Sequence, residues 1–168
     1  MKLIIMACSA TKRPDPGIMP AIRRYDGPMW RTLRARLAEL PRAQAAIQSG
    51  ELRITVLSAL HGFIMADAEI ADYEQRMTAE RAAQLVREPT AKSVRPLVQA
   101  ADAVLFAGGE LYRDAMWRAY GGSLWHLMAI TETDAGGIGR HRVQLGQWLS
   151  EHFGPRAIAE AAQRKAAA

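Results

Sequence analysis

The sequence contains very little cysteine, because Cys8 is the only one among its 168 residues. A single thiol excludes an internal disulfide framework. The four histidines are not accompanied by the Cys pairs or the His-x-x-x-His spacing of zinc sites. We therefore expect no bound metal. No motif indicates a cofactor either, and the glycine-rich stretch 136–142 lacks the spacing of a P-loop for ATP.

Long apolar runs are also missing. Although 49% of the residues are hydrophobic, no run approaches the length that spans a bilayer, and the N-terminus has no signal-peptide pattern. We expect a cytoplasmic protein with no membrane partner, and the oligomeric state stays open. The length favours a single α/β domain at residues 1–154, followed by an alanine-rich C-terminal helix or tail at 155–168.

Acidic residues are scarce at the start of the chain. Residues 1–42 hold nine Lys and Arg residues but only three Asp and Glu residues, and the whole chain carries a net charge of +5. Such a field attracts polyanions, so we expect nucleic acid as the partner, DNA rather than RNA. The alternative is a solvated arginine-rich helix face. The arginines expected at the nucleic-acid backbone are Arg13, Arg23, Arg24, Arg31, Arg34, Arg140 and Arg142.

Short apolar stretches alternate with helical patterns along the chain. The predicted strands are residues 2–7, 52–58, 103–107 and 124–130. This alternation predicts a three-layer α/β fold, with a mostly parallel central sheet of about four strands and helices on both faces. The intervening loops should lie at one edge of the sheet, where open α/β sheets bind ligands. These loops are residues 8–28, 59–77, 108–112 and 131–142.

The first loop, residues 8–28, is rich in proline and glycine, which predicts that it contains no regular helix. Its length is typical of a functional loop. Cys8 is a candidate nucleophile, or alternatively a small buried apolar residue. Ser9 and Lys12 suit an anion site, or alternatively loop capping and a solvated lysine.

Candidate acid–base residues follow the second predicted strand. Asp67 is the first choice, because a carboxylate there would orient water or stabilise a cationic sugar transition state. Glu69 and Asp72 compete with it, and a surface or helix-capping acid is the alternative. His61 would donate a proton near neutral pH, or is a hydrogen-bonded structural histidine.

Further candidates would recognise the substrate. Tyr25 and Tyr73 would stack on an extruded base, unless they are ordinary packing residues. Gly108 and Gly109 allow close backbone approach, although glycines also mark a simple strand-to-helix turn. After these glycines, Glu110 and Tyr112 would read a base edge or a ribose. The stretch 136–142 is similar to a phosphate-gripping loop at a helix start, with Ile138 as a wedge.

Several patches of the sequence resemble known proteins. The patches are Cys8-Ser9-x-x-Lys12, Tyr25-x-Gly-Pro28, the run 57–64 with Asp67, and Tyr73-x-x-x-Met77. Together they resemble a family of bacterial and phage proteins related to the YaaA peroxide-stress proteins, and the first loop resembles the core domain of archaeosine synthase. The resemblance implies a uracil-DNA glycosylase-like fold. Where the YaaA stretch carries a tyrosine, this chain carries His61.

Charge and resemblance together lead to a functional hypothesis. We expect a base-processing enzyme of nucleic acid, a glycosylase-like protein that excises or modifies a base held between the strand-end loops. Asp67, His61 and Cys8 would carry the chemistry. The alternatives are a non-catalytic DNA-binding stress-response protein and a donor-dependent enzyme that forms an amide on a nucleobase.

Overall fold

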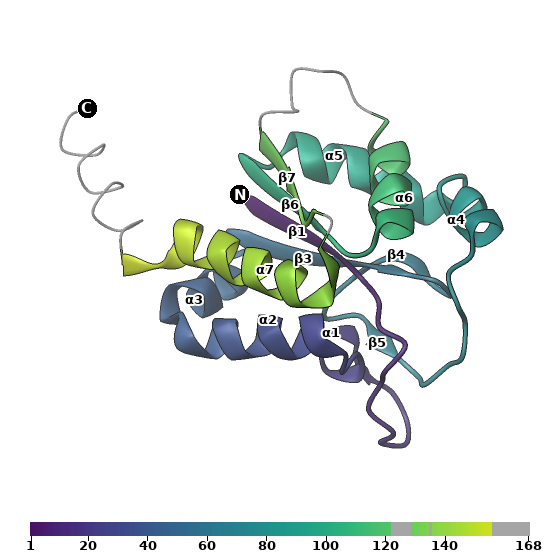
Figure 1. The fold of residues 1–168 in the computed structure, drawn as a ribbon, viewed down its shortest axis with the longest axis horizontal. Coiled ribbons are helices and arrows are strands. Elements are labelled where there is room, and N and C mark those ends of the chain that lie inside the picture. The colour runs from purple at the N-terminus through teal and green to yellow at the C-terminus, as the bar shows by residue number, and fades with distance from the viewer. Residues whose placement is uncertain (122–128, 135, 156–168) are drawn as a thin grey trace.

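The computed structural model describes residues 1–121, 129–134 and 136–155. Its central sheet contains β1 (Lys2–Ala7), β3 (Leu52–Ser58), β4 (Gly62–Met65), β6 (Ala103–Ala107) and β7 (Ile130–Glu132) (Figure 1). The strand order is β4-β3-β1-β6-β7, and every neighbouring pair is parallel except β3 and β4. The predicted α/β class with a mostly parallel central sheet is therefore confirmed.

The central strand β1 is buried because helices cover both faces of the sheet. Its apolar residues Leu3, Ile4, Ile5 and Met6 are wholly inaccessible to solvent. Ile4 and Met6 pack into one helix layer, and Leu3 and Ile5 pack into the other. Burial on both faces explains why this stretch of sequence shows no polar alternation.

The helices form one layer on each face of the sheet (Figure 1). One layer contains α1 (Ala21–Arg24), α2 (Pro28–Glu39), α3 (Pro41–Ser49) and α7 (Gly137–Phe153). The other contains α4 (Ala79–Leu85), the 3₁₀ helix η1 (Pro89–Ser93), α5 (Val94–Gln99) and α6 (Glu110–Tyr120). The predicted helices on both faces are thus confirmed. None of the helices in the described ranges is long and apolar enough to cross a membrane.

The chain adds strands on both sides of β1: β3 and β4 on one side, and then β6 and β7 on the other. The chain leaves β1 toward the layer of α2, whereas it leaves the neighbouring strand β6 toward α6 in the opposite layer. The two connections therefore diverge at the carboxyl ends of β1 and β6. Open α/β sheets bind ligands in the crevice that such a divergence leaves.

The first loop is more structured than its prolines and glycines predicted. Residues 8–28 contain the one-turn helix α1 and strand β2 (Met19–Pro20), which pairs with β5 (Glu69–Ile70). An isolated bridge also joins Lys12 to Tyr25. The expectation of no regular helix was wrong, because pairing with a distant segment and a buried arginine hold this loop in place.

Two strands differ from the sequence-based prediction. β4 lies inside the predicted loop 59–77, where its four residues were too few to show a strand pattern. The last strand, β7, extends beyond the predicted stretch 124–130, because it runs from Ile130 to Glu132, in register with Val104–Phe106 of β6. Residues 122–128 and the predicted tail from residue 156 lie outside the described residues.

Candidate functional site

A cavity of about 190 Å³ lies at the carboxyl ends of β1 and β6. We call it the Cys8 cavity. Its walls come from the ends of these two strands and from the first turns of α2, α6 and α7. The lining residues are Ala7, Cys8, Ser9, Gly27, Pro28, Met29, Trp30, Ala107, Gly108, Gly109, Tyr112, Ile138 and His141. The cavity therefore lies in the crevice where the strand order reverses.

The thiol of Cys8 contacts a phenol in this cavity. Its Sγ lies 3.2 Å from Oη of Tyr112. Burial raises the pKa of Tyr112. The phenol therefore keeps its proton at neutral pH and is available as a hydrogen-bond donor. The backbone around the thiol is fixed, because Cys8 N–H donates to Leu57 O at 3.0 Å and Trp30 Nε1 donates to Ala7 O at 3.0 Å.

Two glycines let the walls of the cavity approach one another. A Cβ at Gly108, whose φ is +156°, would lie 2.6 Å from Cβ of Ala7. A Cβ at Gly27 would overlap the Ser9 hydroxyl. Both positions require a residue without a side chain, because neighbouring protein atoms already occupy that space.

A second polar cluster lies beside the cavity and is centred on Tyr73. The Tyr73 hydroxyl is 2.8 Å from both the Ser58 and the Tyr25 hydroxyls. Lys12 Nζ lies 4.4 Å from the centre of the Tyr73 ring. Burial raises the pKa of Tyr25 to about 12, and it also raises the pKa of Tyr73. Both phenols therefore stay protonated, and they join the first loop to the end of β3.

This cluster changes the roles expected for its members. Tyr25 is wholly buried against Trp30, with ring centres 5.3 Å apart, so its face is not open to an extruded base. The Lys12 side chain is 5% exposed, and its ammonium lies 3.9 Å from Glu74 and over the Tyr73 ring. Ser9 lines the Cys8 cavity as the anion-site prediction requires, whereas Lys12 does not.

His61 belongs to the Tyr73 cluster and not to the Cys8 cavity. Its ring meets the Tyr73 ring edge-on, with centres 5.2 Å apart. Its Nε2 is buried with no hydrogen-bond partner among the described residues. Burial lowers the pKa of His61, so the ring is neutral at pH 7. His61 thus contacts Tyr73, whereas Cys8 contacts Tyr112. The two candidate catalytic residues have different partners.

Asp67 is not brought together with Cys8 or His61. Strand β4 runs antiparallel to β3 and returns the chain toward the amino end of β3, where Ala66 N–H donates to Ile54 O. Asp67 is exposed there, in a separate apolar groove that Leu52 also lines. The expectation that Asp67 lies at the carboxyl edge was wrong, because the unpredicted β4 carries it to the opposite edge, whereas His61 and Tyr73 of the same loop stay near the end of β3. Its competitors Glu69 and Asp72 are also exposed and outside the Cys8 cavity.

The glycine turn after β6 forms part of the cavity. Gly108 and Gly109 line it, as does Tyr112. Glu110 is exposed at the start of α6 and does not line the cavity, so its expected contact with a base edge has no counterpart there.

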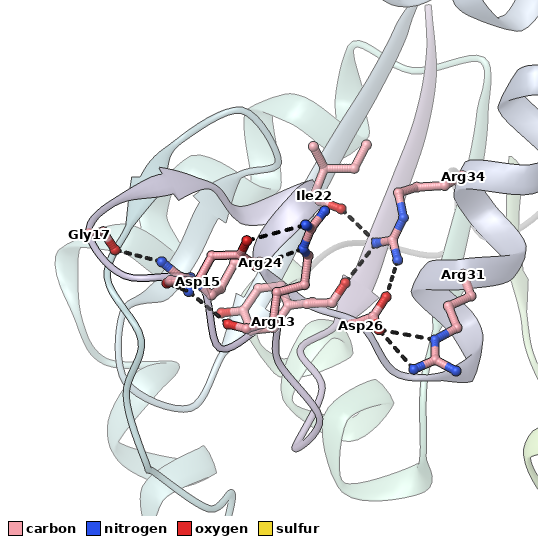
Figure 2. A network of polar contacts seen from close by, with 9 residues as sticks. Arg13, Asp15, Gly17, Ile22, Arg24, Asp26, Arg31 and Arg34 are labelled. Atoms are coloured by element: carbon pink, nitrogen blue, oxygen red, sulfur yellow. Dashed lines mark hydrogen bonds and ion pairs between the residues drawn. The ribbon is translucent and has the colours of Figure 1, made fainter.

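Arg24 and Arg34 organise the first loop from within (Figure 2). The Arg24 guanidinium is fully buried and donates to the carbonyl oxygens of Arg13, Asp15 and Gly17 at 2.6 to 2.8 Å. Its expected contact with a nucleic-acid backbone is therefore replaced by a structural role. Arg34 donates to the carbonyls of Ile22 and Tyr25 and pairs with Asp26, so it is also largely engaged.

Three other arginines line a groove of about 530 Å³ between α2 and α7, which we call the arginine groove. They are Arg31, which pairs with Asp26, Arg36, which pairs with Glu39, and Arg142, whose Nε donates to Thr32 Oγ1 at 2.8 Å. The groove and the Cys8 cavity are both lined by residues of α2 and α7, with Trp30 and Ile138 at the cavity and Arg31 and Gly139 at the groove.

The remaining predicted arginines lie outside both hollows. Arg13 pairs with Asp15 at 2.9 Å, Arg140 pairs with Asp134 at 2.9 Å, and Arg23 is exposed. Of the seven arginines expected at a nucleic-acid backbone, only Arg31 and Arg142 line the groove. Arg36, which was not among the seven, lines it as well.

Sequence reasoning did not assign several residues of the site. Ser58 ends β3 and anchors Tyr73, and Trp30 packs beside Cys8. His141 is 8% exposed and lines the Cys8 cavity. The sequence feature that could have indicated His141 is its position between two arginines, directly after a glycine-rich stretch.

In the described part of the chain, no group of three or more His, Cys, Asp or Glu side chains is placed to hold a metal ion. The cavity instead combines a thiol, a hydroxyl, a phenol and an imidazole between apolar walls. Comparison with protein-family models, with curated proteins and with solved structures finds no match to this chain.

Proposed function

We propose that the protein is an enzyme that binds a nucleobase of nucleic acid in the Cys8 cavity and modifies it by nucleophilic addition of the Cys8 thiol. The observation that carries this proposal is the meeting of Cys8, Tyr112 and His141 in one cavity at the crevice of the sheet. A thiolate nucleophile beside a proton donor is the arrangement that covalent catalysis uses.

The shape of the Cys8 cavity supports a base as the bound group. Met29, Trp30 and Ile138 supply apolar surface against which a flat ring can pack. Its volume of about 190 Å³ lies below the roughly 300–1,000 Å³ of sites for drug-sized ligands. A small ring system therefore fits better than a large organic cofactor.

The lining chemistry favours modification over hydrolysis of the glycosidic bond. Among the described residues no carboxylate lines the Cys8 cavity, and Asp67 lies at the other edge of the sheet. A glycosylase needs a group that activates water or stabilises the cationic sugar. The glycosylase-type reaction expected from the sequence therefore has less support than chemistry at Cys8.

The proposed reaction conserves atoms and charge. The Cys8 thiolate adds to an electrophilic carbon of the base, and the π electron pair moves to the adjacent ring or exocyclic nitrogen. That nitrogen takes a proton from Tyr112 or from His141. The exocyclic amino group of that carbon then takes up this proton and leaves as ammonia, which makes the carbon trigonal again. Water or an amine donor adds to it, the S–C bond breaks to restore the thiolate, and the proton lost by the water or the amine returns to the donor residue.

The arginine groove supports a nucleic-acid substrate. A strand whose base occupies the Cys8 cavity would continue into this groove, where Arg142 has no acidic partner among the described residues. Guanidinium groups bind phosphates well because they present several donors in one plane.

The test incubates the purified protein with canonical DNA, hypermodified phage DNA and transfer RNA, with and without an amino acid donor. Nucleoside mass spectrometry detects modified or released bases, and intact-protein mass spectrometry detects an adduct on the enzyme. We expect a change of base that Cys8→Ala abolishes and Asp67→Asn retains. Base release that requires Asp67 but not Cys8 would overturn the proposal.

The arginine groove also favours a second candidate, a DNA-binding protein without catalysis. In that case no base changes, and Cys8→Ala binds DNA as well as the unmodified protein does. Replacing Arg31, Arg36 and Arg142 together would then abolish binding, because these side chains supply the basic surface of the groove.

A further inference from the structure

Three helices begin at the Cys8 cavity. α2 starts after Gly27, α6 after Gly109 and α7 after Gly136, and no described side chain caps these three starts. Residues from the starts of all three helices line the cavity. The first N–H groups of a helix lack partners within it and carry the positive end of its dipole. The starts of three helices therefore meet at one small volume, with the donors of α2 beginning at Met29 because Pro28 has no N–H.

His141 provides an independent observation. It lies within the first turns of α7, it is 8% exposed and it lines the Cys8 cavity. No hydrogen bond of either ring nitrogen is found within the ranges that the structure describes, and neither nitrogen is among the fully buried polar atoms without a partner. The imidazole is therefore open to the cavity that it lines, where a bound group would pair with it.

The charges around these helix starts suit an anion. The first turns of α2 and α7 contain no acidic residue. Glu110, in the first turn of α6, is exposed and does not line the cavity. No carboxylate of the described residues thus occupies the place where an anion would sit.

We infer that this convergence of helix starts binds the phosphate group of a nucleotide, with His141 as a further donor. The inference deepens the proposed function and rests on it, because it assigns the phosphate that accompanies the base bound beside Cys8. The phosphate belongs either to a free mononucleotide or to a phosphodiester in a strand. Helix N-termini bind both kinds through the same N–H groups.

Gly109 allows a test in which loss of binding is separated from loss of the fold. A Cβ at this position meets nothing within 4 Å, and its φ of −65° suits any residue. In Gly109→Asp the new carboxylate caps α6 itself and repels a phosphate. Gly109→Ala adds the Cβ without the charge and is the matched control. His141→Phe keeps a ring of similar size and removes the nitrogen donors.

The measurement is isothermal titration calorimetry with inorganic phosphate, the four deoxynucleoside 5′-monophosphates, the matching deoxynucleosides and a short single-stranded oligonucleotide. We expect at least one monophosphate, or the oligonucleotide, to bind about tenfold or more tightly than the nucleosides. Gly109→Asp should remove this gain while raising the thermal unfolding midpoint. His141→Phe should weaken it, and Gly109→Ala should keep most of it.

The outcomes distinguish a free nucleotide from a strand as the source of the phosphate, and they test the phosphate site and the base-modifying activity separately. Tight binding of monophosphates indicates a free nucleotide, whereas a gain seen only with the oligonucleotide indicates a phosphodiester. Equal binding of nucleotides and nucleosides, or a gain that survives both Gly109→Asp and His141→Phe, overturns the phosphate site. Phosphate-dependent binding without any base modification rejects the proposed function alone. Modification at the unmodified rate by Gly109→Asp rejects the phosphate site alone.

Discussion

The thiol of Cys8 lies 3.2 Å from the hydroxyl of Tyr112, although 104 positions separate the two residues in the chain. Cys8 follows β1, and Tyr112 lies in the first turn of α6, directly after β6. They meet because β1 and β6 are neighbours in the sheet, in register from Lys2 and Ala103 onward. Every role that we assign to the Cys8 cavity depends on this pairing.

The first prediction concerns this contact. Tyr112→Phe removes the protonated phenol beside the sulfur and keeps the ring. We expect it to lower kcat for base modification by about a hundredfold, the lower end of the contribution of general acid catalysis. Steady-state kinetics on the substrate found by mass spectrometry measures this loss. An unchanged kcat would show that Tyr112 takes no part in proton transfer.

The second prediction concerns the buried Arg24. Arg24→Met keeps an apolar stem but leaves the carbonyls of Arg13, Asp15 and Gly17 without their donor. We expect a loss of about 3 kcal/mol in the free energy of unfolding, because several buried acceptors lose their partners together. Urea unfolding followed by circular dichroism measures it.

The neighbouring Arg23 is exposed and provides the matched control. Arg23→Met should change the free energy of unfolding by less than about 0.5 kcal/mol. Comparable losses in both variants would contradict the role of Arg24 as the internal support of the first loop.

The third prediction concerns the close approach at Gly27. In Gly27→Ala the new methyl group overlaps the Ser9 hydroxyl, so Ser9 must rotate or the start of α2 must move away from the first loop. We expect a destabilisation of about 1–3 kcal/mol, typical of overpacking. Thermal unfolding of this variant is compared with that of Gly139→Ala, where the added Cβ meets nothing within 4 Å. Gly139→Ala should be neutral or stabilising, because alanine favours helix.

The fourth prediction concerns pH. Burial raises the pKa of Tyr25 to about 12, whereas an unfolded tyrosine ionises near pH 10. The stability that this buried neutral phenol contributes is therefore fully present below pH 10 and is lost as the pH rises toward 12. Tyr73, hydrogen-bonded to Tyr25, has its pKa raised as well and adds to the same loss.

Urea unfolding at intervals from pH 8 to pH 11.5 tests this prediction. The free energy of unfolding should fall above about pH 10 in the unmodified protein. Tyr73→Phe should be less stable at pH 8, because Ser58 and Tyr25 lose a hydrogen-bond partner, and its fall at high pH should be shallower. Parallel pH profiles for the two proteins would rule out the predicted contribution of Tyr73.

The fifth prediction concerns the arginine groove. Arg36→Ala and Arg142→Ala remove cations that line it. Each variant should weaken binding of single-stranded DNA and reduce the salt dependence of log K by about 0.7, the value for one lost phosphate contact. Fluorescence anisotropy at several salt concentrations measures both quantities. Arg118→Ala, at an exposed position of α6 in the opposite helix layer, should leave both unchanged.

The sequence alone determined the frame of this protein. Residues 2–7, 52–58 and 103–107 became β1, β3 and β6 with the predicted bounds, because strands covered on both faces are rich in apolar and β-branched residues. The start of α2 at Pro28 and the Thr78 cap of α4 also follow from local residue preferences. These signals are local, so they are readable without knowledge of the fold.

Only the tertiary structure decided which candidate residues meet. The order of the strands placed Cys8 beside Tyr112, and the short strand β4 carried Asp67 to the opposite edge of the sheet. Burial turned Arg24 from a candidate phosphate ligand into the internal support of a loop. Such outcomes depend on contacts between segments far apart in the chain. Residue type and spacing reveal what each side chain is able to do, whereas packing decides which partner it finds.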